Sequence, residues 1–471
     1  MSWKRNAGWL SVLLIFLSGC ATVALNAGFD EVSVAVAERG AGKIVWNSGT
    51  DLDKEAAEKV SSLLKGGLTA DEAVQIALLN NRDLQAIYSD LGIAQADLVQ
   101  AGLFQNPVFD AAVLFPVSGG RPDLDLSVVM NFLDVFYVPL RKRVATARFE
   151  ETKLKVAGAV LDFARQVRTA FYLHQANEQM LELRRTVVQT LTASLELARR
   201  LHEAGNITDL DFARERALTE AARLELRTAE MAERQSREQL NALMGVWGKN
   251  TEWRTGGRLP DIPAQTTAGD DLERLALSRS LDLSIARQRI IAAGEQLGFN
   301  RATALIPEPT LGPLGEREEG WEAGPTVELS IPLFDRGQAR IARALTELRR
   351  ARQEYYGLAV RIRSVARAVQ DRMSGSRDRA LYYRDILVPL RERIVNEAQL
   401  QYNAMQLSPF ELLRAKEQQI ETAAAYIEAL RDYWLARTDF AHILNGRLPG
   451  LDGGGARSEE GRMKMNGREA H

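Results

Sequence analysis

The chain has 471 residues, of which 46% are hydrophobic and 26% are charged, and its formal net charge at pH 7 is −2. This length accommodates two or three ordinary domains, and the charged fraction excludes a bundle of membrane-spanning helices. The near-neutral charge provides no basic face of the kind that duplex nucleic acid requires, so we expect no nucleic-acid partner. A single cysteine excludes disulfides within the chain and thiolate metal clusters.

Residues 1–19 have the pattern of a signal peptide. Lys4 and Arg5 precede an apolar run, AGWLSVLLIFL, that is too short to span a bilayer as a folded helix. The run ends in Leu-Ser-Gly-Cys, which resembles a bacterial lipobox, so we expect Cys20 to carry a covalent lipid such as palmitate. Ala21 follows the cysteine, where an aspartate would favour retention in the inner membrane, and this indicates the outer membrane. The alternative is an ordinary signal peptide with an incidental cysteine.

The remaining chain divides into two similar halves. We expect a weakly structured lead-in over 20–67, a first repeat over 68–246, a linker over 247–268, a second repeat over 269–446 and a disordered tail over 447–471. Residues 77–84 (ALLNNRDL) match residues 276–283 (ALSRSLDL), and this predicts an internal two-fold repeat.

Each repeat is predicted to contain helix, β-hairpin, long helix and helix, in that order. The first helix begins with the capping-box spacing of Thr69 and Glu72 and runs to about Gln105. The hairpins are expected at 107–116 with 124–132 and at 308–316 with 322–333, because apolar and polar residues alternate there over roughly the 9–11 residues that a tilted membrane strand needs. The helices that follow are expected at 139–202, 209–244, 337–402 and 409–444.

Residues 203–216 (EAGNITDLDFARER) and 403–416 (NAMQLSPFELLRAK) form the same helical hairpin tip in the two repeats. In the first tip, Gly205 suits a left-handed helix end, and Thr208 with Asp211 forms a capping box. In the second tip, Ser408 is the cap of a helix that begins at Pro409, where a missing N–H does no harm.

The sequence contains no pattern that indicates an enzyme. The four histidines, at 174, 202, 442 and 471, have no paired spacing, so we expect no metal site and no cofactor beyond the lipid at Cys20. Met463, Met465 and His471 in the tail have side chains that can bind a soft metal such as Cu(I). We expect the tail to bind no metal.

The order and spacing of these motifs resemble the TolC family of outer-membrane efflux proteins over about 68–446. The resemblance rests on VELSIPLFDRG at 327–337, FLDVFYVPLRKR at 132–143, the duplicated tip and the Leu-Asn-Gly at 444–446. It implies a mainly α fold with a small β part, in which long antiparallel helices form an α-barrel and two β-hairpins contribute to a shared transmembrane β-barrel. It also implies a homotrimer that is inserted in the lipid of the outer membrane. Its long helices would extend through the periplasm and pack against one another as in a coiled coil.

The family's pattern assigns a periplasmic gate to the tips. In that pattern a tyrosine, a basic residue and two acids lie at the tip. Tyr402 matches the tyrosine, and Glu411 matches the first of the two acids. Leu407 stands at the position where the basic residue is often found. Arg414 replaces a second acid, and it would neutralise Glu411 one turn along the helix. Glu411 is also the capping partner of Ser408, and both roles stay open. Further gate candidates are Asp209 and Asp211, for which the alternative is the ordinary preference of acids for a helix's first turn.

The resemblance implies a passive exit duct for small toxic compounds or metal ions, joined by a periplasmic adaptor to an inner-membrane pump. The alternatives are the exit duct of a type I protein secretion system and a structural coiled-coil lipoprotein without a pore. The alternating strands argue against the second alternative, because a rod needs no lipid-facing sheet.

Overall fold

The structure is a computed structural model that describes residues 23–24, 26–47, 49–115, 122–264, 271–305, 310–317, 320–328 and 333–449. The chain divides into two compact units. Unit 1 comprises Met1–Val32, Ala86–Val156 and Leu283–Leu358, and unit 2 comprises Ser33–Gln85, Ala157–Asp282 and Ala359–His471. The predicted signal peptide, Cys20 and the chain from residue 450 onward lie outside the described residues.

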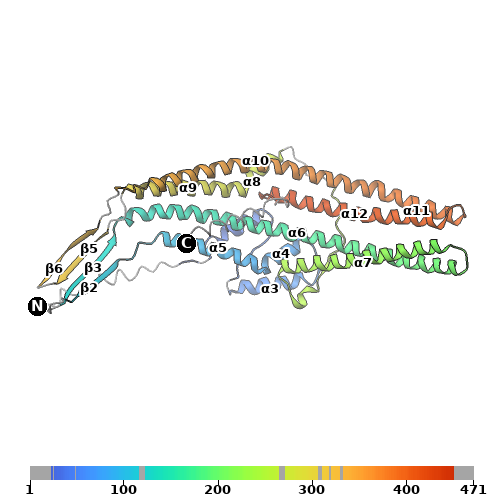
Figure 1. Cartoon of the computed structure of the whole chain (residues 1–471), viewed down its shortest axis with the longest axis horizontal. Coiled ribbons are helices and arrows are strands. Elements are labelled where there is room, and N and C mark those ends of the chain that lie inside the picture. Colours follow the sequence, from blue (N-terminus) through green and yellow to red (C-terminus); the bar gives the residue numbers. More distant parts are fainter. Residues whose placement is uncertain are drawn as a thin grey trace. The chain divides into compact units, whose positions relative to one another are not determined.

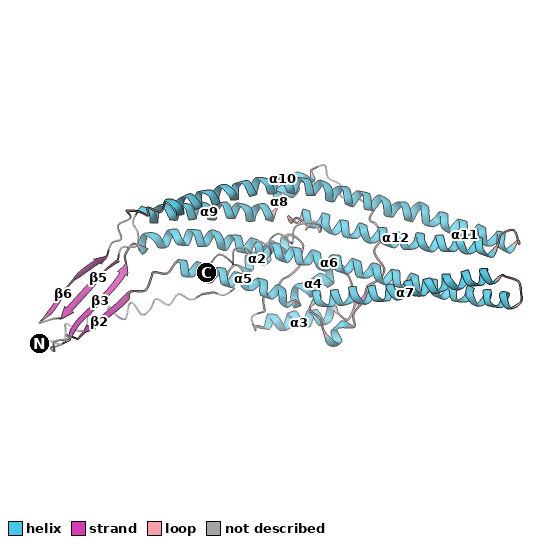
Figure 2. Cartoon of the chain, in the orientation of Figure 1, coloured by secondary structure: helices cyan, strands magenta, loops and turns pink. Residues whose placement is uncertain are grey.

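Helices make up most of the described chain, with a small β part, as predicted (Figures 1 and 2). The elements in chain order are α2 (Phe29–Glu38), α3 (Asp51–Leu63), β1 (Gly67–Leu68), α4 (Ala70–Asn80), α5 (Arg82–Ala101), β2 (Val108–Leu114), β3 (Asp123–Asn131), α6 (Asp134–Glu203), α7 (Asp209–Met244), η1 (Gly248–Thr251), β4 (Arg254–Thr255), α8 (Leu272–Arg279), α9 (Leu281–Leu305), β5 (Thr310–Arg317), β6 (Trp321–Glu328), α10 (Gln338–Tyr382), the π-helical turn η2 (Tyr383–Leu387), α11 (Val388–Asn403) and α12 (Pro409–Leu444). From α4 to α7 and from α8 to α12, helices and hairpins follow one another in the same order.

The expectation of a weakly structured lead-in is wrong for the described residues of 20–67, because α2 and α3 form there. The segment that forms α3 places Ala56 and Val60 one turn apart, and both side chains are buried. In α2, the ring of Phe29 packs edge-on against Tyr88 with 5.2 Å between the ring centroids. These short helices therefore owe their stability to packing rather than to length.

The first helix of each repeat is broken near its middle, where a continuous helix was predicted. The break between α4 and α5 is at Asn81, and the break between α8 and α9 is at the matching Ser280; both residues have extended backbones. The Asn81 carboxamide accepts a 3.0 Å hydrogen bond from the Leu84 N–H and donates to the Leu243 carbonyl at the end of α7, also at 3.0 Å. The capping box at Thr69 is confirmed.

The two long helices differ from each other. Helix α6 has 70 residues, roughly 105 Å at 1.5 Å per residue, and it begins five residues before the predicted start at Pro139. The other long helix is divided by the π-helical turn η2 into α10 and α11. Pro389 explains the division, because it has no N–H to donate to the carbonyl of residue 385 one turn earlier.

In unit 1, both predicted hairpins form, and they join into one antiparallel sheet with the strand order β2-β3-β5-β6. Leu126 lies opposite Ala111 on one side and Gly315 on the other, and Leu311 lies opposite Val327. Residues 116–121 and 329–332, which include part of the predicted second hairpin, lie outside the described residues. Among the described helices, none is both long and apolar enough to cross a membrane.

The predicted linker is built into unit 2. Leu259 and Ile262 are buried in one apolar cluster with Ala429 and Trp434 of α12. The indole N–H of Trp434 donates to the Pro260 carbonyl at 2.8 Å, and β4 pairs in parallel with β1. The segment between the two repeats therefore contributes to the core of unit 2.

Candidate functional site

Two helical hairpin tips lie in unit 2, one between α6 and α7 (tip 1, residues 203–211) and one between α11 and α12 (tip 2, residues 403–411) (Figure 1). In tip 1, Gly205 has the predicted positive φ of 75°. The matching residue of tip 2 is Met405, which adopts φ 59° and is 96% exposed. The two turns therefore share one backbone conformation, although only tip 1 has the residue that suits it.

The caps of both tips lie where the sequence predicted them. The Thr208 hydroxyl accepts the Asp211 N–H at 3.2 Å, and the Ser408 hydroxyl accepts the Glu411 N–H at 3.3 Å. The capping box is complete only in tip 2, where the Glu411 carboxylate accepts the Ser408 backbone N–H at 3.4 Å. Asp211 accepts a hydrogen bond from the Thr208 hydroxyl instead. Aspartate is one methylene shorter than glutamate, so its carboxylate bonds the hydroxyl rather than the backbone.

The gate candidates of tip 2 are only partly brought together. Glu411 and Arg414 are both exposed, and the described part of the chain contains no ion pair between them. In tip 1, by contrast, the matching Arg214 lies 3.7 Å from the Asp211 carboxylate. Because the Glu411 carboxylate turns back toward Ser408, the Arg414 charge is left free to face its surroundings.

Tip 1 contains a contact that sequence reasoning missed. The His202 Nε2 atom lies 2.5 Å from the Asp209 carboxylate, and the imidazole stacks on the Phe212 ring with 5.1 Å between centroids. In tip 2 the matching positions are occupied by Tyr402, Pro409 and Leu412, which cannot form this ion pair. A histidine just before the turn and an acid just after it would have been the signal.

A cavity of about 660 Å³ lies in unit 2 behind the tips. It is lined by α6, α7, α11 and α12, with Leu191, Leu218, Tyr402, Pro409 and Leu412 among its walls. Tyr402 is half-buried there rather than projecting from the end of tip 2. The two hairpins therefore lie side by side and leave an apolar groove between them.

The strand register in unit 1 sorts the sheet into two chemically different faces. Residues that lie opposite each other on neighbouring antiparallel strands share a face. One face is apolar, with Arg317 as a charged exception, and presents Phe109, Val113, Leu124, Leu126, Val128, Met130, Leu311 and Val327. The other face is more polar and presents Asp110, Asp123, Asp125, Ser127, Asn131, Glu316, Glu322 and Glu328, with Val108, Ala112, Leu114, Val129 and Leu314 as apolar exceptions.

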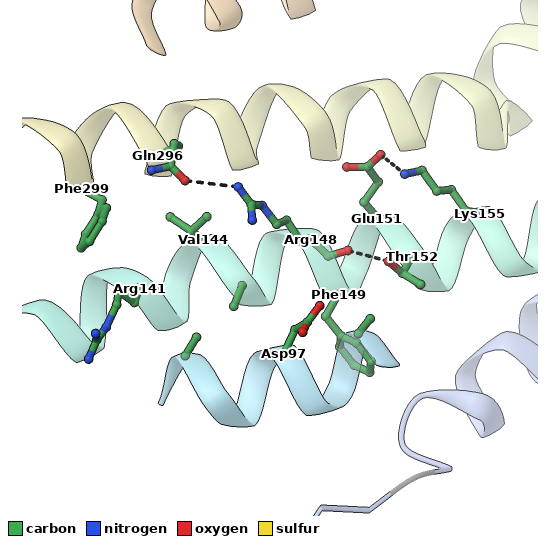
Figure 3. A pocket seen from close by; sticks show the side chains of 13 residues that line it. Asp97, Arg141, Val144, Arg148, Phe149, Glu151, Thr152, Lys155, Gln296 and Phe299 are labelled. Atoms are coloured by element: carbon green, nitrogen blue, oxygen red, sulfur yellow. Dashed lines mark hydrogen bonds and ion pairs between the residues drawn. The ribbon is translucent and has the colours of Figure 1, made fainter. Parts of the chain in front are cut away.

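A second cavity, of about 700 Å³, lies in unit 1 between α5, α6 and α9 (Figure 3). Its basic side chains have partners: Lys155 contacts the Glu151 carboxylate at 2.6 Å, and Arg148 donates to the Gln296 amide oxygen at 3.3 Å. Arg289 of α9 also donates to Glu151, at 2.8 Å. Lys155 and Arg289 thus share the Glu151 carboxylate, and these contacts link α6 to α9.

Comparisons with known proteins agree with this geometry. None of the protein-family models matches the chain. The chain is 23% identical over 394 residues to the cobalt-zinc-cadmium resistance protein CzcC of Cupriavidus metallidurans, with 80% of this chain and 90% of that protein covered. It is 24% identical over 372 residues to the probable efflux pump outer membrane protein TtgC of Pseudomonas putida, with 70% and 72% covered. The crystal structure of the CmeC outer membrane channel of Campylobacter jejuni has the same fold, with a TM-score of 0.65 and 14% identity over 91% of this chain and 94% of that one.

The chain resembles the TolC family of outer-membrane efflux proteins. TtgC is named as an outer membrane protein and CmeC as an outer membrane channel, which agrees with the expected outer-membrane location of this chain. Within the TolC-family fold, the predicted gate residues lie at or beside the tips, and their role stays a prediction. The lipid at Cys20 also stays a prediction, because that residue is outside the described part of the chain.

Proposed function

We propose that this chain is the outer-membrane exit duct of a tripartite efflux system, a passive homotrimeric channel that crosses the outer membrane and the periplasm. The observation that carries the proposal is the four-stranded sheet with one apolar and one polar face. Such alternation suits strands with lipid on one side and water on the other.

The strand number supports the homotrimer. Among the described residues, β2 and β6 each have a neighbour on one side only, so the four strands leave two open edges. Open edges are not tolerated in lipid, and bacterial barrels begin at about eight strands. Copies of the chain must therefore share one barrel, and three copies would supply twelve strands.

The proposed system assigns energy supply, connection and export to different proteins. We infer that it is not an enzyme, and that it has no cofactor beyond a covalent lipid at Cys20. An inner-membrane pump would supply the energy, and a periplasmic adaptor would connect the pump to the tips. The name of CzcC favours metal ions as cargo, and the name of a second TtgC of Pseudomonas putida, a toluene efflux pump protein, favours small toxic compounds. They give no support to the alternative of a secretion duct, and the two-faced sheet opposes a rod without a pore.

Acidic residues give the proposed conduit a preference for cations. The polar face of the sheet carries six acids, and it has no basic residue among the described strand positions. The tips add Asp209, Asp211 and Glu411, with Arg414 as an opposing charge. Rings of like charge in a narrow pore favour counter-ions of the opposite sign.

Single-channel conductance in planar bilayers tests the proposal, with the wild type compared with Glu411→Ala and Arg414→Asp. We expect cation-selective steps, a weaker preference for cations in Glu411→Ala and a stronger one in Arg414→Asp. If steps appear but neither substitution alters them, the duct stands and the gate assignment is wrong. Without conductance and without a heat-modifiable oligomer in detergent, the duct itself would be rejected.

A further inference from the structure

A buried histidine in unit 2 has one ring nitrogen without a hydrogen-bond partner. His174 of α6 is 0% exposed, and its Nδ1 atom lies 3.0 Å from the hydroxyl oxygen of Ser236 on α7. That hydroxyl donates its only proton to the Glu233 carbonyl oxygen at 2.9 Å. It must therefore accept the hydrogen bond from His174, so Nδ1 carries the ring proton and Nε2 carries a lone pair.

The lone pair of His174 points toward two carboxylates. Its Nε2 atom lies 3.6 Å from a carboxylate oxygen of Glu178, one turn further along α6. One ligand atom each from His174, Glu178 and Glu233 lies within 4.8 Å of the others. Within the described residues, His174 Nε2 has no hydrogen-bond partner. Three side chains that can each donate an electron pair to a metal therefore lie close together.

Neighbouring groups orient the three side chains. The Thr255 hydroxyl donates to Glu178 at 2.5 Å, and Ser236 fixes the plane of the imidazole. Such outer contacts are typical of histidine and carboxylate metal ligands. Arg237 is a competing cation, but it approaches Glu233 only to 3.8 Å, because its guanidinium stacks on the Trp253 ring at 4.5 Å and donates to nearby carbonyls.

We propose that His174, Glu178 and Glu233 bind one divalent cation of the zinc class, with water completing the coordination. One imidazole with two carboxylates suits zinc or cobalt better than calcium or magnesium, which prefer oxygen ligands alone. Zinc bonds of 2.0–2.1 Å require ligand atoms roughly 3.4 Å apart, so the carboxylates must close in by about 1 Å. The Glu178 side chain is 30% exposed, which gives it freedom to move and gives the ion a path from solvent.

This ion would be resident rather than cargo. His174 and Glu178 come from α6 and Glu233 from α7, while Thr255, which holds Glu178, belongs to β4. A bound cation would therefore clamp the α6–α7 hairpin next to the segment that joins the two repeats. The expectation of no metal site considered only pairs of histidines, and it overlooked a histidine and a glutamate four residues apart on one helix face.

The test uses the purified full-length protein after removal of metal with a chelator. Titration with Zn²⁺ alone, followed by calorimetry, is expected to give one ion per chain, and the ion is expected to raise the thermal unfolding midpoint. Glu178→Gln and Glu233→Gln should each weaken binding at least tenfold, and His174→Gln should abolish it. Titration with Co²⁺ should give the visible absorption of a nitrogen- and oxygen-coordinated ion in the wild type and not in His174→Gln.

Two matched variants serve as controls. His202→Gln changes the other described histidine of α6, and Glu182→Gln changes an exposed acid one turn beyond Glu178 that pairs with Arg258. Both should bind zinc as the wild type does. Circular dichroism shows whether each variant folds; if His174→Gln does not, the half-buried Glu233 decides the question. The proposal is overturned if the wild type binds no ion, or if Glu178→Gln and Glu233→Gln bind it unchanged.

Discussion

The carbonyl oxygen of Gly446 accepts a 2.8 Å hydrogen bond from the Leu281 N–H, and this bond joins the chain just after α12 to the break between α8 and α9. The first repeat has a similar joint, in which the Asn80 side chain donates to the Gly245 carbonyl at 2.7 Å. Both glycines have positive φ, 89° at Gly446 and 65° at Gly245. In each predicted repeat, a hydrogen bond therefore joins the end of the last helix to the break in the first helix.

Gly446→Ala should destabilise the protein strongly. A Cβ atom at Gly446 would lie 2.1 Å from the Arg279 carbonyl oxygen, and the left-handed backbone alone costs an alanine about 1–2 kcal/mol. The matched control is Gly375→Ala in α10, where a Cβ meets nothing within 4 Å and helix propensity favours alanine by roughly 0.5–1 kcal/mol. Thermal unfolding in detergent should show a lower midpoint for the first variant and an equal or higher one for the second. Equal midpoints for both variants would show that the close contact at Gly446 does not contribute to stability.

Met405→Gly should stabilise tip 2. Methionine pays about 1 kcal/mol for its left-handed backbone at φ 59°, and its side chain is almost fully exposed, so glycine loses little packing. Gly205→Ala should have the opposite effect on tip 1, where the backbone has φ 75°. Amide hydrogen exchange measures the local opening of each tip. We expect slower exchange in tip 2 of Met405→Gly and faster exchange in tip 1 of Gly205→Ala, with the other tip unchanged in each case.

Asp162 should make the free energy of unfolding of unit 2 depend on pH. Burial raises the pKa of Asp162, but hydrogen bonds from His442 and Arg447 outweigh burial, and the pKa lies below its ordinary value. The unfolded chain then binds the proton more tightly than the native protein does. The stabilisation is therefore complete above the ordinary aspartate pKa of about 3.9, and it is lost as the pH falls through the lowered pKa.

The measurement for Asp162 is the thermal unfolding midpoint of wild type and Asp162→Asn against pH. At pH 7 the variant should unfold at a lower temperature, because it loses charge-assisted bonds to Arg447 and His442 worth roughly 1.5–3 kcal/mol. Below about pH 4 the two curves should begin to converge, and they should meet once the pH is below the lowered pKa of Asp162. Asp371→Asn, at an exposed position of α10, should follow the wild type throughout. A constant gap between Asp162→Asn and wild type down to pH 3 would contradict the assignment.

Local chemistry made some elements predictable from sequence. The structure confirms the predicted bounds of α7 and α12. These bounds were predictable because Thr208 and Ser408 cap the two helices, and because Gly245 ends α7 and the Leu-Asn-Gly sequence ends α12. The strands were predictable because one face of the sheet is apolar. The breaks at Asn81 and Ser280 were not, because helical periodicity continues across them and the bonds beside them come from segments distant in sequence: Asn81 bonds the end of α7, and Leu281 bonds Gly446.

Side-chain clusters drawn from distant segments were also beyond sequence reasoning. The tip residues were found because each cap and its partner are three positions apart. Glu233 approaches His174 only after α7 folds back along α6, and no spacing in the sequence records that contact. The π-helical turn before Pro389 was visible in principle, because a proline inside a helical pattern signals a break or a kink.

Arginine substitutions on the two faces of β3 separate a membrane strand from an ordinary surface strand. Leu126 lies on the apolar face, so Leu126→Arg should cost about 2–4 kcal/mol if that face contacts lipid near the bilayer midplane. Ser127 lies on the polar face directly opposite Asp110, so Ser127→Arg should fold normally and gain an opposite charge. The readout is the fraction of heat-modifiable oligomer formed in lipid vesicles, followed by ion selectivity in planar bilayers. We expect Leu126→Arg to lose the oligomer, and Ser127→Arg to keep it with a weaker preference for cations. Equal tolerance of both substitutions would mean that the apolar face does not contact lipid.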